Sequence, residues 1–79
     1  MDKALMIEIL MQDRCTKKEA EKHLNTGTEV FESPEEYIEI LKANNCYYGE
    51  TIEAIRNNEI ADMSMVTYNG HEYLVVYAN

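Results

Sequence analysis

Hydrophobic and polar positions recur with different periods along the chain, and the period of each stretch predicts its secondary structure. Residues 2–14 carry apolar side chains around most of a helix, so we expect this helix to be largely buried. A second helix is expected over residues 16–25. Thr16 and Glu19 are spaced as in a capping box, and Gly27 suits the left-handed position that ends a helix.

The clearest helix start in the chain is at Ser33. Its hydroxyl can cap a helix, Pro34 occupies the first helical position and Glu36 the third. We expect this helix to run to about Ala43 and to turn four apolar side chains toward the core. These are Tyr37, Ile38, Ile40 and Leu41.

Weaker patterns lie on either side of this third helix. Residues 28–32 alternate between polar and apolar side chains and predict a short strand. Residues 44–49 are typical of a loop, and a short fourth helix over residues 51–57 would offer Ile52 and Ile55 to the core.

The C-terminal stretch predicts a β-hairpin. Asn69 and Gly70 suit a two-residue turn with positive φ, and β-branched and aromatic residues flank them. Such a turn fixes the register, because Tyr68 must then pair with His71. The pairs that follow are Val66 with Tyr73, Ser64 with Val75, Met65 with Leu74 and Met63 with Val76.

The two faces of this hairpin differ in chemistry. One face is aliphatic and should lie against helices; it contains Met63, Met65, Leu74 and Val76. The other face, called here the tyrosine face, contains Val66, Tyr68, Tyr73, Val75 and Tyr77. Tyrosine suits interfaces because its large ring is buried at low entropic cost while the hydroxyl keeps a hydrogen bond. The tyrosine face is therefore either a contact surface or covered by helices too.

Together these elements predict an α+β fold, with three to four short helices packed on a small antiparallel sheet. The 79 residues fit a single small acidic domain, 1–79. A chain near this length buries only about 60% of its unfolded surface, so self-association or a partner would help its stability. No stretch reaches the roughly 18 apolar residues of a membrane span.

Charge is distributed unevenly along the chain. Residues 1–27 contain five acids and five bases, whereas residues 28–79 contain ten acids and two bases, so the net charge of −8 lies entirely in the second part. A surface that is acidic over one face repels nucleic acid and anionic membranes and attracts basic partners. Alternatively, these carboxylates only keep a small protein soluble.

The acids of the second part gather before and within the third helix. The candidate partner-binding acids are Glu29, Glu32, Glu35, Glu36 and Glu39. Carboxylates on a helix face stand about 5–6 Å apart, close to the pitch of backbone phosphates. They could therefore occupy a basic groove meant for nucleic acid. The helix dipole also explains acids in a first helical turn.

Direct nucleic-acid binding is not expected, although Arg14, Lys17, Lys18 and Lys22 form a basic cluster near a capped helix. Acidic residues interleave with these lysines. They weaken the release of counterions that drives such binding. The simpler interpretation is a solvated helix surface.

The candidate chemistry of the chain is sparse. Cys15, Cys46, His23 and His71 form no C-x-x-C or H-x-x-x-H pair, and no glycine-rich segment accompanies them. We therefore expect no cofactor, no metal and no enzymatic activity. The cysteines show no pairing motif and the N-terminus lacks the features of a secretory signal, so a cytoplasmic location is expected.

In general character the chain resembles the small acidic accessory proteins of phages and mobile elements, which include anti-CRISPR inhibitors. The resemblance lies in size, acidity, the segment TKKEAEKHLNTGTEVFE at 16–32 and the hairpin MVTYNGHEYLVVY at 65–77. It implies a non-enzymatic inhibitor of a basic nuclease or regulator. The alternative is a housekeeping accessory protein, or a homodimer that uses Tyr68, Tyr73 and Tyr77.

Overall fold

The computed structural model describes residues 1–45 and 49–78, and it confirms the α+β fold. Within this part of the chain the helices are α1 (Lys3–Met11), α2 (Lys17–Asn25), α3 (Pro34–Ala43) and α4 (Gly49–Arg56). The strands are β1 (Glu29–Phe31), β2 (Met63–Tyr68) and β3 (His71–Val76). They form one antiparallel sheet in the order β1-β3-β2, so β3 is the central strand.

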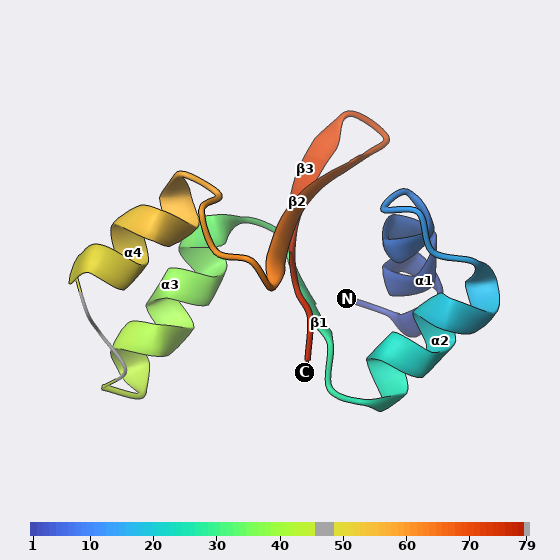
Figure 1. Ribbon diagram of the computed structural model, residues 1–79, viewed down its shortest axis with the longest axis horizontal. Helices are drawn as coiled ribbons and strands as arrows, with labels where there is room; N and C mark the ends of the chain where they lie inside the picture. The colour runs from blue at the N-terminus through green and yellow to red at the C-terminus, as the bar shows by residue number, and fades with distance from the viewer. Residues whose placement is uncertain (46–48, 79) are drawn as a thin grey trace.

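The sheet lies between two pairs of helices, as Figure 1 shows. We call α1 with α2 the first layer and α3 with α4 the second layer. Each layer has its own apolar core against one face of the sheet. The buried residues on the first side are Ile7, Ile9, Leu10, Ala20, Val30, Val66 and Val75. Those on the second side are Phe31, Ile38, Ile52, Ile55 and Leu74.

The central strand β3 contributes to both cores. Adjacent side chains of a strand point to opposite faces, so Leu74 enters the second core and Val75 the first. Leu74 is 1% exposed and Val75 is fully buried. The two cores are therefore separated only by the thickness of the sheet.

The two predictions for the hairpin concern its register and the surroundings of its two faces. The observed register is the expected one, and Asn69 and Gly70 take φ of 50° and 78°. The aliphatic face lies against the second layer, as expected. The tyrosine face is covered by the first layer, because its tyrosines are partly buried beside α1 and α2. Helices therefore cover this face in part, and its tyrosines keep intermediate exposure.

The helix starts follow their sequence signals. The Thr16 hydroxyl accepts a hydrogen bond from the Glu19 N–H at 3.1 Å, and the Glu19 carboxylate accepts one from the Thr16 N–H at 2.9 Å. This is the predicted capping box. Gly27 follows α2 with φ of 105°, a conformation that glycine adopts without strain. Asp2 caps α1 through the Leu5 N–H, at 2.8 Å.

Three predicted details need correction. α1 ends at Met11 instead of residue 14, and it is only partly buried, since the Met11 side chain is 38% exposed. Ile40 is 42% exposed instead of facing the core. Each residue turns a helix by about 100°, so Ile40 points roughly 200° away from the buried Ile38. α4 begins at Gly49 and ends at Arg56, slightly before the predicted 51–57.

Candidate protein-binding surface

The five candidate acids follow one another along the chain from β1 to α3. Glu29 shares a face of the sheet with Phe31, which packs in the second core. Glu32 follows β1, and the other three acids belong to α3. All five side chains are exposed: Glu29, Glu32, Glu35, Glu36 and Glu39. Three of the predicted acids therefore belong to the second layer, and Glu29 lies on the sheet face that this layer covers.

Two of these acids have basic partners within the second layer. Arg56 of α4 donates to both oxygens of Glu35, with Nε–Oε1 at 2.9 Å and Nη2–Oε2 at 3.2 Å. The hydrogen bond from Arg56 lowers the pKa of Glu35 below its ordinary value. Lys42 lies 3.8 Å from Glu39 across one helical turn. Because these pairs are exposed, they contribute little to stability, but they orient the carboxylates.

Glu36 has a structural task. Its carboxylate accepts a hydrogen bond from the Glu32 N–H at 3.1 Å, and its own N–H donates to the Ser33 hydroxyl at 3.2 Å. These bonds satisfy backbone groups at the start of α3. The helix-capping interpretation of Glu36 is thus confirmed. Among the described residues, no lysine or arginine pairs with Glu29, Glu32 or Glu36.

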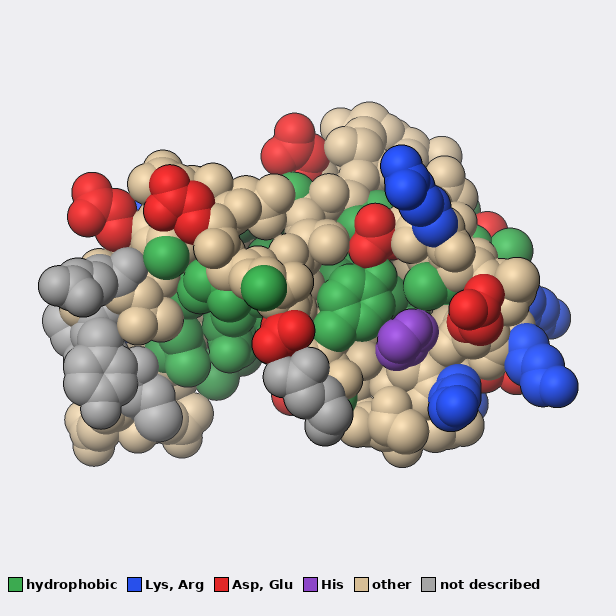
Figure 2. Space-filling model, in the orientation of Figure 1, with side chains coloured by type: hydrophobic (Ala, Val, Ile, Leu, Met, Phe, Trp, Pro, Cys, Tyr) green, Lys and Arg blue, Asp and Glu red, His purple; other side chains and the backbone are tan. Residues whose placement is uncertain are grey.

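The two ends of the molecule differ in charge. Residues 32–62 contain eight acids and two bases, whereas residues 1–27 contain five of each. Figure 2 shows lysines and arginines gathered over the first layer, among acids, while acidic side chains stand over the second layer. The side chain of Glu50, one of the eight acids, lies outside the described part. The second layer therefore has a negative surface that the first layer lacks.

The predicted tyrosines are partly buried beneath the first layer. The Tyr77 hydroxyl donates to the Asp13 carboxylate at 2.5 Å, and the His23 ring meets the Tyr77 ring edge-on with centroids 5.1 Å apart. Burial, followed by the bond to Asp13, raises the pKa of Tyr77 far above its usual range. Tyr68 and Tyr73 pack against the same core. Tyr77 thus fastens the end of the sheet to the first layer.

Sequence reasoning missed the contacts that join distant segments. Asp13 and Tyr77 are 64 residues apart, and Glu35 and Arg56 are 21 apart. His71 is a third example, because its Nε2 lies 2.7 Å from the Glu32 carbonyl oxygen. No local spacing signals such pairs, since they depend on how the layers fold together.

The described residues show little catalytic chemistry. Burial raises the pKa of the Cys15 thiol, so the reactive thiolate is disfavoured. Cys46, and any pairing of it with a histidine, lies outside the described residues. Within residues 1–45 and 49–78, no three His, Cys, Asp or Glu side chains converge as metal ligands. No helix there is long and apolar enough to span a membrane.

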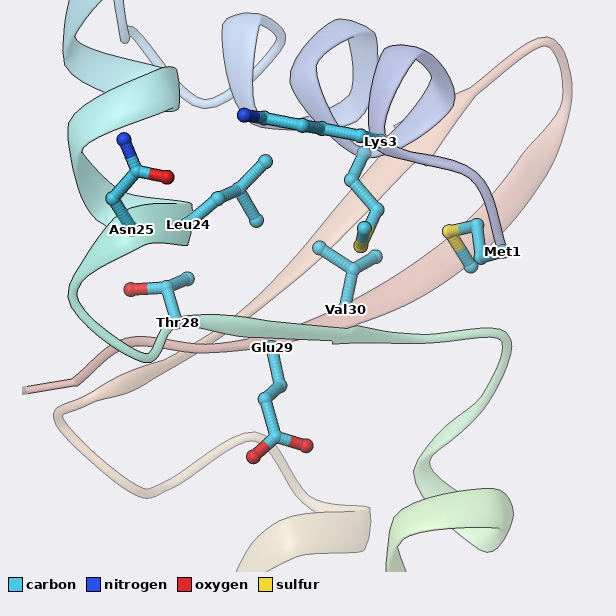
Figure 3. Close-up of a pocket in the computed structure, with 8 residues that line it drawn as sticks. Met1, Lys3, Leu24, Asn25, Thr28, Glu29 and Val30 are labelled. Carbon is cyan, nitrogen blue, oxygen red and sulfur yellow. The ribbon is translucent and has the colours of Figure 1, made fainter.

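A hollow of about 400 Å³ opens between the start of α1, the end of α2 and β1. In Figure 3, Leu24 and Val30 point into it, while the Glu29 carboxylate points away. Lys3 supplies its other charged group. Its remaining lining residues are Met1, Met6, Asn25 and Thr28, so half of the lining is apolar.

Comparison with known proteins gives no relative. No protein-family model, curated protein or solved structure matches this chain.

Proposed function

We propose that this protein is a non-enzymatic binding module whose second layer docks on a basic protein. The observation that supports the proposal is the separation of charge between two layers of the same fold. The acids that would face the partner are Glu29, Glu32, Glu35, Glu36 and Glu39. An acidic layer on a compact domain attracts basic surfaces over roughly 8–10 Å at physiological salt.

The five acids differ in the contacts that their carboxylates already make. Glu29 and Glu32 have no basic partner among the described residues, so they are available to an incoming cation. Glu35 is held by Arg56, and a basic partner would compete with that guanidinium. Glu36 remains engaged with the start of α3. Complementary charge of this kind chiefly raises the association rate and sets the choice of partner.

A charge-reversal experiment with a matched control tests the proposal. Glu32→Lys with Glu39→Lys reverses two charges at or beside the second layer, and Glu8→Lys with Glu21→Lys reverses two in the first. Each double variant changes the net charge by the same amount. Proteins captured from a lysate of the source cells by wild type and both variants, at low and at moderate salt, would be quantified by mass spectrometry.

We expect wild type and the first-layer variant to retain basic proteins at low salt. The second-layer variant should lose them, and moderate salt should weaken their retention. Equal recovery by all three forms would refute the proposal, because the acids would then not contribute to binding. Equal loss from both variants would also refute it, because only net charge would then matter.

The resemblance to anti-CRISPR inhibitors gives the proposal a more specific form. The acidic layer would occupy a groove of a cytoplasmic nuclease or regulator that otherwise binds nucleic acid. The captured protein should then release a labelled oligonucleotide when wild type is added, but not when the second-layer variant is added. Simultaneous binding of both would reject this mode of inhibition.

A further inference from the structure

The sheet has two edge strands, and they are protected very differently. Among the described strands, β1 and β2 each pair only with β3, so each has one side on which backbone groups point away from the sheet. Unprotected edges of this kind invite pairing with another strand. The helices of both layers cover the faces of the sheet (Figure 1), so only its edges could pair with a further strand.

The edge of β1 is closed at both ends. The Thr28 N–H donates to the His23 carbonyl at 3.0 Å, and the Glu32 N–H donates to the Glu36 carboxylate at 3.1 Å. The strand itself is only three residues long. From the antiparallel register, Val30 is the one residue of β1 whose N–H and C=O point away from β3.

The edge of β2 is longer and has no comparable protection. Tyr68 and His71 flank a two-residue turn and exchange hydrogen bonds, so every second residue of β2 faces β3. The others, Met63, Met65 and Thr67, point their backbone groups outward. The Met63 N–H donates to the Ile60 carbonyl at 3.1 Å. Within the described part of the chain, no group bonds the outward N–H of Met65 or Thr67.

The sequence of β2 also lacks the usual deterrents to pairing. Residues 63–68 contain no charged residue and no proline, and the strand has a regular register with β3. Natural edge strands commonly carry lysine, proline or a bulge to prevent association. β2 is therefore an uncharged, six-residue edge on a protein of net charge −8.

We propose that two copies of this chain pair antiparallel along β2 and join their sheets into one of six strands. Charge limits where a second copy can approach, because two molecules of net charge −8 repel each other wherever carboxylates face. The β2 edge brings no charged side chain of either strand into contact.

A twofold axis at Met65 gives a register in which the Thr67 N–H faces the Met63 carbonyl of the second copy, while the Met63 N–H keeps its bond to Ile60. Met65 lies opposite Met65 of the second copy, and Thr67 lies opposite Met63. Residues of equal parity meet in this register, so outward backbone groups face each other and each side of the sheet continues with the same face. The pairing leaves the acidic layer unused, so this inference goes beyond the proposed function.

Sedimentation velocity over a range of concentrations tests this pairing with Thr67→Pro and its control Thr67→Val. Proline removes the outward N–H of an exposed edge residue, whereas valine keeps it. We expect a dimer for wild type and Thr67→Val, and dimerisation weakened about tenfold or more for Thr67→Pro. Added salt should strengthen the dimer, whereas it should weaken the capture of basic proteins.

Hydrogen exchange in wild type gives a second measurement that needs no variant. The amides of Met65 and Thr67 should exchange more slowly as concentration rises, while those of Ser64 and Val66, already bonded to β3, should not change. A monomer at all concentrations and salts, or concentration-independent exchange at Met65 and Thr67, would overturn the inference.

Discussion

The first and second layers bury similar apolar side chains against one sheet, yet they present differently charged surfaces to solvent. Ile9 of α1 and Ile38 of α3 are both fully buried. Outside, acids and bases balance over the first layer, whereas acids dominate the second. Packing requirements set the inner sides of the helices and leave the outer sides open to charge of either kind.

Each layer also has its own contact between residues far apart in the sequence. In the first, the Tyr77 hydroxyl binds Asp13 in a partly buried setting; in the second, Arg56 binds Glu35 in an exposed one. A partly buried bond to a carboxylate is worth more than an exposed ion pair. The first layer is therefore fastened more firmly, and the second keeps its charged groups accessible.

The largest effects should come from the two cores. Ile9→Ala and Ile38→Ala each remove a fully buried side chain, so each should lower the free energy of unfolding by about 2–5 kcal/mol. Because β3 belongs to both cores, we expect a single cooperative transition in each variant. Denaturant unfolding followed by circular dichroism and by tyrosine fluorescence would measure both. Two separate transitions would mean that the layers fold independently.

The next largest effect should come from the hydrogen bond between Tyr77 and Asp13 in the first layer. Tyr77→Phe leaves the Asp13 carboxylate without its donor and should cost about 1–3 kcal/mol. Because the fold raises the pKa of Tyr77, the protonated hydroxyl stabilises the folded state. This stabilisation is fully present below pH 10, the ordinary pKa of tyrosine, and is lost as the pH rises further. Stability measured above pH 10 should therefore fall less steeply in Tyr77→Phe. Parallel pH profiles would contradict the assigned bond.

Helix caps allow a closer comparison of the layers. Thr16→Ala in the first layer and Ser33→Ala in the second each remove a hydroxyl that accepts a hydrogen bond from a backbone N–H. Each should cost about 1 kcal/mol, measured by thermal or denaturant unfolding. If only Thr16→Ala had an effect, the start of α3 would depend on Pro34 and Glu36 instead.

The smallest effect should be the acid dependence of exposed carboxylates. Hydrogen bonds lower the pKa of Glu35 in the second layer and of Glu19 in the first below the ordinary 4.5. Their stabilisation is present above pH 4.5 and is lost as the pH falls through the lowered values. Glu35→Gln and Glu19→Gln should each make unfolding less dependent on pH in this range. An unchanged acid profile would show that the bond is absent in solution.

Local signals in the sequence were enough to predict the elements and the hairpin register. A capping box at Thr16, the start at Ser33 and the turn at Asn69 are each fixed by residues a few positions apart. These features depend on short-range backbone hydrogen bonds. They are therefore the part of a fold that one sequence specifies most directly.

Features that depend on layer packing could not be predicted. The tyrosines of the hairpin have the chemistry of a contact surface, and only the position of α1 and α2 shows that they are covered. Ile40 belongs to an apolar run but points away from the sheet. The acidic residues were identified correctly as exposed, whereas the pairing of Glu35 with Arg56 needed α3 and α4 side by side.

The place of β3 at the centre of the sheet has a consequence during synthesis on the ribosome. β1 must wait for a partner whose pairing residues lie more than 40 positions later, since Phe31 pairs with Leu74 and Glu29 with Val76. Until β3 emerges, α1 and α2 have no completed sheet to cover. Most of the nascent chain therefore exists before either core can close, and the interval exposes apolar side chains to chaperones.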